Sequence, residues 1–161
     1  MALNAYLKIT GQKSGQIAGG VTQKGREGSI YVDDLAYGVV SPRDPASGLP
    51  TGRRQHQPVQ VTVPTGRQTP LVFNAAVTNE NLTMVEVDFW LPGAGGRGLE
   101  TLAFTLKLTN ASISEFDLNL ETDTSGSSSL LDKYSFTFQK IELTWTDGGI
   151  TAEDDWSPSP A

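Results

Sequence analysis

The sequence predicts an all-β domain, built as an antiparallel, strongly bent β-barrel with one short flanking helix at about residues 70–77. Three observations lead to this fold class. Apolar and polar residues alternate along most of the chain, which is the pattern of half-buried strands. Residues 70–77 alone carry apolar side chains at helical spacing. The alternation also changes phase within two long strands, as expected where strands bend around a barrel.

Length and composition favour one domain followed by a tail. The chain has 161 residues and no cysteine, which is enough for a hydrophobic core without disulfides or a structural metal. We expect the barrel domain over residues 1–147. Residues 148–161 contain acidic residues, glycines and prolines and are expected to form a flexible acidic tail.

The first half of the chain is expected to form three strand regions separated by two long loops. Alternation places the first strand at Leu3–Ile9, and residues 29–40 form the second strand region. Residues 11–28 are rich in Gly, Gln, Ser and Lys and are expected to be a loop. Residues 41–50 carry three prolines and a glycine, so we expect an extended loop there. A short third strand follows at residues 59–63, before Pro64.

The single helix is expected from Pro70 to about Val77. Thr69 can cap it, and Pro70 suits the first helical position because its missing N–H would have no partner there. Two pairs at i, i+4 spacing form the apolar face expected to pack on the sheet: Leu71 with Ala75 and Phe73 with Val77.

The second half is expected to contain long strands. Their expected ranges are 85–91, 102–120 and 134–145, joined by turns at 92–98 and 123–129. The phase of alternation changes near Asn110 and again at Gln139–Lys140. A phase change requires a bend or an extra residue, which predicts strongly curved strands.

Charge and hydropathy exclude several classes of function. The formal net charge is −6, whereas a nucleic-acid binder usually carries a basic patch, so we expect no nucleic-acid partner. The N-terminus lacks the basic and apolar regions of a signal peptide. No apolar run approaches the roughly 20 residues that span a bilayer, so we expect no membrane insertion. The chain is therefore expected to be made in the cytoplasm and, if exported, to leave without a cleaved signal.

The sequence contains no recognisable motif for a catalytic, cofactor or metal site. His56 is the only histidine, so neither a zinc site nor a catalytic triad is indicated. Asp33 and Asp34 are adjacent on a strand and would point to opposite faces, and the pair at 154–155 lacks the spacing of a calcium loop. The glycines of residues 93–98 match a dinucleotide motif, but a strand rather than a helix follows them. A hydrolase assembled from carboxylates on distant strands stays open at this point.

Five segments in order along the chain carry a resemblance to a known family. They are residues 5–11 (AYLKITG), 54–59 (RQHQPV), 69–80 (TPLVFNAAVTNE), 106–113 (LKLTNASI) and 134–145 (YSFTFQKIELTW). They resemble Hcp, the tube protein of the bacterial type VI secretion system. The resemblance extends from residue 2 to about residue 146, and each segment is weak alone while the ordered set is specific.

The resemblance implies a structural role rather than catalysis. It implies homohexameric rings that stack into a hollow tube, enclosed by a contractile sheath and capped by a trimeric spike protein. The tube would carry effectors in its lumen and be secreted without a signal peptide, outside the cell or into a target cell. Alternatives are a phage tail-tube protein, a monomeric ligand-binding barrel and a hydrolase. Only about 15 residues follow the last expected strand, too few for an added enzymatic domain.

Two sets of residues are candidates for contacts between subunits. The prolines in the long loop after the second strand region reduce the entropy lost on docking, which suggests a ring-stacking loop. Its candidate residues are Ser41, Pro42, Arg43, Asp44, Pro45, Arg53, Arg54 and Gln55. A large aromatic among acids on the face opposite the core suggests a subunit interface. Its candidate residues are Trp90, Glu86 and Asp88.

Overall fold

In a computed structural model, residues 3–92 and 100–156 are described, and they form eleven strands and one helix. The N-terminal strands are β1 (Asn4–Gly11), β2 (Gly15–Ile17), β3 (Ile30–Val32), β4 (Asp34–Ala36), β5 (Val39–Val40), β6 (Gln55–His56) and β7 (Val59–Pro64). The remaining elements are α1 (Thr69–Val77), β8 (Leu82–Leu91), β9 (Thr101–Thr122), β10 (Ser128–Trp145) and β11 (Ile150–Asp155).

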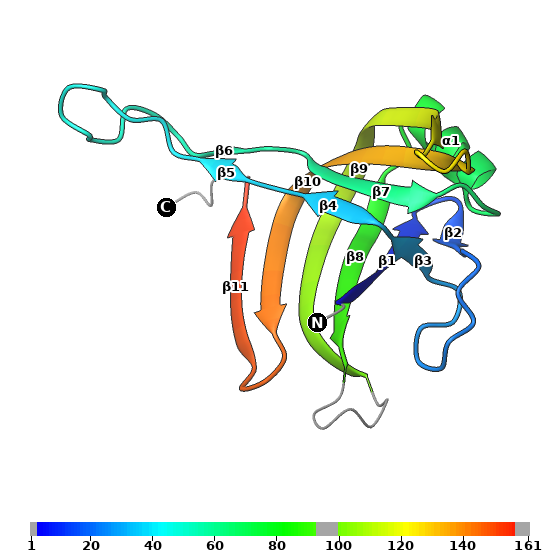
Figure 1. The fold of residues 1–161 in the computed structure, drawn as a ribbon. Helices are drawn as coiled ribbons and strands as arrows, with labels where there is room; N and C mark the ends of the chain where they lie inside the picture. The colour runs from blue at the N-terminus through cyan, green and yellow to red at the C-terminus, as the bar shows by residue number, and fades with distance from the viewer. Residues whose placement is uncertain (1–2, 93–99, 157–161) are drawn as a thin grey trace.

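Nine of the strands form one antiparallel, strongly bent sheet (Figure 1). Its main path runs β2-β1-β8-β9-β10-β7-β4, with β3 also pairing with β1 and β11 pairing with β10. Residues 30–36 connect the two sides, because β3 pairs with β1 while β4 pairs with β7. No ladder joins β1 directly to β7 among the described residues. The predicted fold class is confirmed as a strongly bent antiparallel sheet that stops short of a closed barrel.

The two longest strands bend together at the level where the sequence changes phase. Asn110 in β9 has a φ of 51°, and its side-chain amide donates to Gln139 Oε1 at 3.0 Å across the ladder. A second irregularity follows: Ile113 pairs with Phe136, whereas Glu115 pairs with Ser135, so the residue between them is extra. The predicted bend thus combines a left-handed asparagine with a β-bulge.

The core fills the concave side of the bent sheet, and helix α1 packs beside it (Figure 1). The alternating residues of β1, β7, β8, β9 and β10 point inward, as the period of two predicts. The largest fully buried side chains are Tyr134, Phe136, Leu7, Ile9, Ile17, Leu82 and Leu108, with five valines beside them.

The helix lies where it was expected, but it packs on a different face. Val72 and Ala75 are its buried residues, whereas Phe73 and Val77 are exposed. Of the expected i, i+4 apolar face only Ala75 is buried, while Leu71, Phe73 and Val77 are exposed, because a nine-residue helix buries only one narrow stripe. Thr69 is also not the cap: its hydroxyl donates to Asp132 at 2.5 Å instead.

Two expected irregular segments contain strands. Residues 15–17, inside the expected loop, form β2. Residues 150–155, inside the expected flexible tail, form β11, which pairs with β10 along its whole length. Acidic side chains suit an exposed edge strand, but they are equally typical of a flexible tail. Composition therefore did not predict this strand. The expected turn at residues 93–98 and residues 157–161 of the tail lie outside the described residues.

A buried carboxylate fixes the turn between β1 and β2. Glu80 is 7% exposed and accepts hydrogen bonds from the backbone N–H of Lys13 (3.1 Å) and Ser14 (2.9 Å) and from the Ser14 hydroxyl (2.8 Å). These hydrogen bonds lower the pKa of Glu80. A Cβ atom at Gly11 would overlap Glu80 Oε2, so only glycine leaves room for this carboxylate.

Replacing that glycine is expected to destabilise the fold. Gly11→Ala should displace Glu80 from its three donors and lower the free energy of unfolding by about 2 kcal/mol, measured by urea denaturation. Gly20→Ala is the matched control, because no atom lies within 4 Å of its added Cβ. An equal change in both variants would contradict the role given to Glu80.

Candidate functional site

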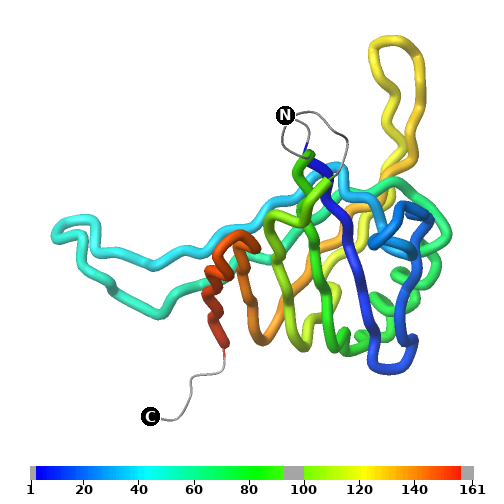
Figure 2. The backbone as a smooth tube through the Cα atoms, turned by 90° about the horizontal axis from the view of Figure 1, so that it is seen from below, coloured from blue at the N-terminus to red at the C-terminus, as the bar shows by residue number. Residues whose placement is uncertain are grey.

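The most distinctive surface feature is a long arm that projects from one side of the sheet (Figures 1 and 2). The arm comprises residues 38–57, and β5 and β6 pair antiparallel near its root. Further out, Arg43 forms a bridge with Pro50, and the Thr51 N–H donates to the Pro42 carbonyl at 3.0 Å. The arm is therefore an ordered two-stranded ribbon, and it carries all eight residues predicted for ring stacking.

A compact turn closes the tip of the arm. The Asp44 carboxylate accepts hydrogen bonds from the Ser47 hydroxyl (2.8 Å) and the Ala46 N–H (3.2 Å). The hydrogen bond from Ser47 lowers the pKa of Asp44. The Asp44 N–H donates to the Leu49 carbonyl at 2.8 Å, and the Leu49 side chain is 64% exposed. The tip is therefore a turn ordered by hydrogen bonds, and it exposes the apolar side chain of Leu49 to solvent.

The root of the arm is held by the C-terminal strand. His56 Nε2 lies 2.6 Å from Asp154 Oδ2, and His56 Nδ1 lies 2.7 Å from the Tyr37 hydroxyl. Arg54 also hydrogen-bonds Asp154 and donates to the backbone carbonyl of Asp155 at 2.9 Å. The Trp156 ring packs 5.1 Å from the His56 ring. Two segments about 100 residues apart in the sequence therefore meet here, and they set the direction of the arm.

This cluster contains a hydroxyl, an imidazole and a carboxylate in line, but its surroundings do not suit catalysis. The His56 side chain is 4% exposed and is packed by Phe138 and Trp156, and the pocket that it lines has a volume of only about 40 Å³, which is small for a substrate. Burial, together with the negative charge of Asp154, raises the pKa of Tyr37, which makes its hydroxyl a weak nucleophile. The cluster is an anchor for the arm. The sequence indicated no catalytic triad or zinc site at His56, and it could not show that His56 pairs with Asp154.

Removing the carboxylate is expected to loosen the arm. Asp154→Asn should accelerate trypsin cleavage after Arg53 and Arg54 by roughly two- to fivefold, the range expected for a partly exposed ion pair. The exposed turn residue Asp147 provides the control variant Asp147→Asn. Equal cleavage rates in the wild type and Asp154→Asn would contradict the anchoring role.

The same carboxylate predicts a dependence on pH. The hydrogen bond from Arg54, together with His56, lowers the pKa of Asp154. A lowered folded-state pKa contributes stability that is complete above the ordinary aspartate pKa of about 4. That contribution is lost as the pH falls through the lowered value. The difference in urea midpoint between the wild type and Asp154→Asn should therefore be present at pH 7 and narrow below pH 4.

The predicted interface residue Trp90 is covered within the subunit. The Arg26 guanidinium lies 4.4 Å from the Trp90 ring centroid and 5.0 Å from that of Tyr6. Arg26 also pairs with Glu100 at 2.6 Å. The loop before β3 therefore packs over Trp90 through cation–π contacts, a partnership that strand alternation could not reveal. A role for Trp90 at a subunit boundary stays a prediction.

The two acids beside Trp90 also have partners in the same subunit. Asp88 is buried and pairs with Lys8 at 3.4 Å, and the Thr105 hydroxyl lies 3.4 Å from it. Glu86 is half-buried, and burial together with the charge of Asp88 raises its pKa. The sheet brings Glu86, Asp88 and Trp90 onto one face, as alternation predicted, while their place in an interface stays untested.

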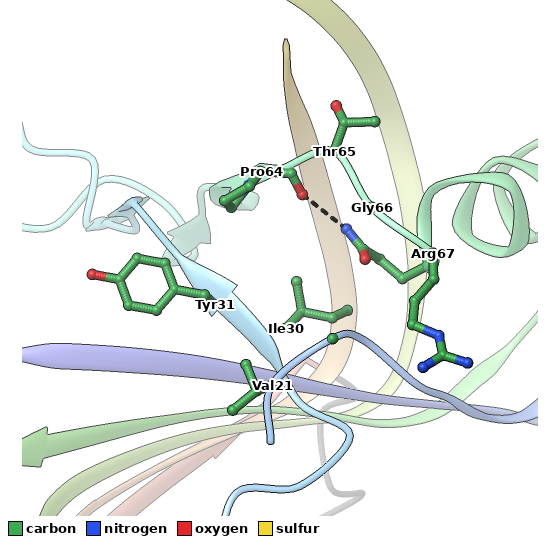
Figure 3. Close-up of a pocket in the computed structure, with 9 residues that line it drawn as sticks. Val21, Ile30, Tyr31, Pro64, Thr65, Gly66 and Arg67 are labelled. Carbon is green, nitrogen blue, oxygen red and sulfur yellow. Dashed lines mark hydrogen bonds between the residues drawn. The ribbon is translucent and has the colours of Figure 1, made fainter. Parts of the chain in front are cut away.

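The hollow shown in Figure 3 lies between the loop before β3 and the turn that precedes α1. It has a volume of about 320 Å³ and is lined by Val21, Ile30, Tyr31, Pro64 and Arg67 among others. The Gln68 amide, which also lines it, donates to the Pro64 carbonyl at 3.0 Å. Its walls contain no carboxylate, imidazole or thiol, so they offer no general acid or base.

Two kinds of feature are absent from residues 3–92 and 100–156. No three histidine or acidic side chains are grouped so that they could hold a metal ion in that part of the chain. No helix there is long and apolar enough to cross a membrane.

Comparison with known proteins gives a consistent result. A family model described as "Type VI secretion system effector, Hcp" matches residues 6–145. The "Major exported protein" of Pseudomonas aeruginosa is 33% identical, over 97% of this chain and 96% of that protein. The chain belongs to the Hcp family. This agrees with the resemblance found in the sequence.

Solved Hcp structures have the same fold. One described as "Crystal structure of Hcp protein" superposes with a TM-score of 0.88 at 29% identity and covers 98% of this chain and 100% of its own. Hcp1 from E. coli EAEC 042 superposes at 0.83 with 27% identity, over 96% and 99% of the two chains. Hcp3 from Pseudomonas aeruginosa gives 0.79 at 27% identity, over 96% and 99%. As a member of the Hcp family, the chain is a self-associating tube protein of type VI secretion rather than an enzyme.

Proposed function

We propose that this Hcp protein forms hexameric rings that stack into the hollow inner tube of a type VI secretion system. The observation that carries the proposal is the family match over residues 6–145. The superposition on a solved Hcp protein over 98% of the chain supports it. We further propose that residues 1–147 form the assembling barrel, since the family match ends at residue 145, and that residues 148–161 support it through β11, which carries the Asp154 anchor of the arm.

The arm supports stacking as one of the two contacts that a tube requires. It projects well beyond the sheet (Figure 2), and residues 45–55 are all exposed. Arg43 and Arg53 make no ion pair with any described residue, although the chain as a whole is acidic. Exposed arginines on a preformed projection are suited to binding a neighbouring subunit.

Exposed apolar side chains support the ring contact. The core-facing side of the β9–β10 ribbon continues beyond the core at both ends. Leu118 and Leu120 are exposed at one end of the ribbon. At the other end Trp145 is exposed, together with Ile150, its pairing partner on β11. A monomer would leave these apolar side chains in water. A ring with head-to-tail contacts buries two different surfaces of each subunit, which these two ends would supply.

The remaining parts of the proposal concern partners. A tube of this kind would meet a trimeric spike protein at its tip and a contractile sheath around it, and its lumen would hold effector cargo. Export supports the same reading, because the 33% identical relative is named a major exported protein. The phage tail-tube alternative receives less support, because the matching family and the solved relatives are Hcp proteins.

Negative-stain electron microscopy and analytical ultracentrifugation of the purified protein test the proposal. We expect rings of six subunits, a sedimentation mass near six times the chain mass of 17.2 kDa, and stacks at high protein concentration. A protein that stays monomeric at high micromolar concentration would contradict it and favour a monomeric ligand-binding barrel.

A further inference from the structure

A second projection leaves the body of the molecule at a wide angle to the arm (Figure 2). It is the end of the β9–β10 hairpin, residues 115–133, of which residues 115–130 extend past the strands that pair with β9 and β10 on either side. One face of this hairpin packs toward α1, where the Phe116 ring lies 5.5 Å from the Phe73 ring. Its other face carries the residues of opposite parity, and no described strand or helix besides α1 and the sheet neighbours packs extensively on β9 or β10.

That uncovered face contains a hollow lined by acids. The hollow has a volume of about 310 Å³, and Asp33, Glu121 and Asp123 lie in its wall with Leu131. None of the three carboxylates pairs with a lysine or arginine among the described residues. Asp123 accepts hydrogen bonds from Ser125, which lower its pKa and keep it charged.

The charges of the two projections are opposite. Residues 115–133 contain five acids and one lysine, a net charge of −4, whereas the arm (residues 38–57) contains three arginines and one aspartate, a net charge of +2. Of the arginines, Arg54 is held by Asp154, which leaves Arg43 and Arg53 without a described partner. Each surface also offers an apolar side chain to the other: Leu49 is exposed at the arm tip, and Leu131 lines the hollow.

The arm and the hairpin of one chain do not meet, because they leave the body in different directions (Figure 2). We propose that the acidic face of the β9–β10 hairpin, with the hollow of Asp33, Glu121 and Asp123, receives the arm of a second copy, whose Arg43 and Arg53 pair with its carboxylates. Partly desolvated pairs of opposite charge in a contact between subunits fix its register and exclude other partners. The inference rests on the proposed function, since it names the surface that the stacking arm binds.

The contact is tested by reversing the charges on each side separately and then combining the two reversals in one protein. Asp33→Lys with Glu121→Lys places like charges opposite the arm, and Arg43→Glu with Arg53→Glu does the same from the other side. Each pair should lower the fraction of stacked rings by about tenfold or more in ultracentrifugation at low salt. Asp123 is left unchanged because it also orders its own turn. The four substitutions together should restore stacking to within about twofold of the wild type.

A matched control changes the net charge equally outside the hollow. Glu27→Lys with Asp147→Lys adds the same charge, and both residues are exposed and lie outside the hairpin and the arm, so stacking should persist. Circular dichroism and thermal melting confirm that each variant is folded. Stacking unaffected by reversal in the hollow, or not restored in the combined variant, overturns this inference alone. A wild type that forms no stacks overturns the proposed function and the inference with it.

Discussion

Deletion of Pro42–Thr51 is expected to yield rings that no longer stack into tubes. The deletion removes the exposed tip, whereas the root of the arm stays anchored through His56 and Asp154 at 2.6 Å. The ends of the deleted segment already lie together, because the Thr51 N–H donates to the Pro42 carbonyl at 3.0 Å. Residues 41 and 52 can therefore be joined without straining the sheet, and the ring contact should be unaffected.

Two measurements test this prediction: tube length by electron microscopy and ring mass by analytical ultracentrifugation. We expect stacks to be absent in the deletion variant at concentrations where they dominate in the wild type, with an unchanged ring mass and a melting temperature within a few degrees. A companion variant replaces Pro42, Pro45 and Pro50 with alanine and keeps the tip. It should stack more weakly, because each proline limits the conformations of the free arm by about 0.4–1 kcal/mol. Tubes formed by the deletion variant would overturn the role of the arm.

The local pattern of the sequence was sufficient for most of the fold. Alternation identified the inward faces of the long strands, because a half-buried sheet enforces a period of two. The phase changes at Asn110 and Gln139 predicted the bend, and the structure places these two residues opposite each other with a hydrogen bond of 3.0 Å. Thr69-Pro70 located the helix, although the cap was wrong and only Ala75 of the predicted apolar face is buried, because both depend on what the helix packs against.

The parts that sequence reasoning missed depend on contacts between distant segments. His56 and Asp154 are 98 residues apart, and nothing local marks them as a pair. Trp90 was expected at a subunit interface, but the Arg26 guanidinium packs over its ring within the same chain. Arg26 lies in a segment whose composition predicted only a loop. The strand β11 was missed because its acidic residues are typical of a tail, although Gly148 and Gly149 with φ of 86° and 62° form the turn that returns the chain to β10.

Asp132→Ala is expected to cost more stability than any other polar substitution in the described chain. Asp132 is fully buried in β10 and accepts hydrogen bonds from the hydroxyls of Thr65 (2.7 Å), Thr69 (2.5 Å) and Tyr134 (2.5 Å). These donors come from the turn after β7, the first residue of α1 and the core of β10. One carboxylate therefore joins the helix start to the sheet, and the helix is too short to be stable without such a connection.

Removing this carboxylate leaves three hydroxyl groups without their acceptor, and that of Tyr134 is buried in the core. We expect a loss of about 3–5 kcal/mol in the free energy of unfolding, which lowers the melting temperature by roughly 6–20 °C for a chain of this size. Thr65→Val removes a single donor and should cost only about 1 kcal/mol. Asp132→Asn keeps one acceptor oxygen and should fall between the two.

Urea denaturation and calorimetry of the four proteins, including the wild type, order these costs. The order also tests the mechanism, because a cavity alone would make Asp132→Asn, which has nearly the same volume as the wild-type residue, almost neutral. A loss in Asp132→Asn well above that of Thr65→Val indicates that the carboxylate acts through its hydrogen bonds to three hydroxyls. Burial and the Asp132 carboxylate also raise the pKa of Tyr134, so the tyrosine keeps its proton and remains a donor throughout the pH range in which the tube would assemble.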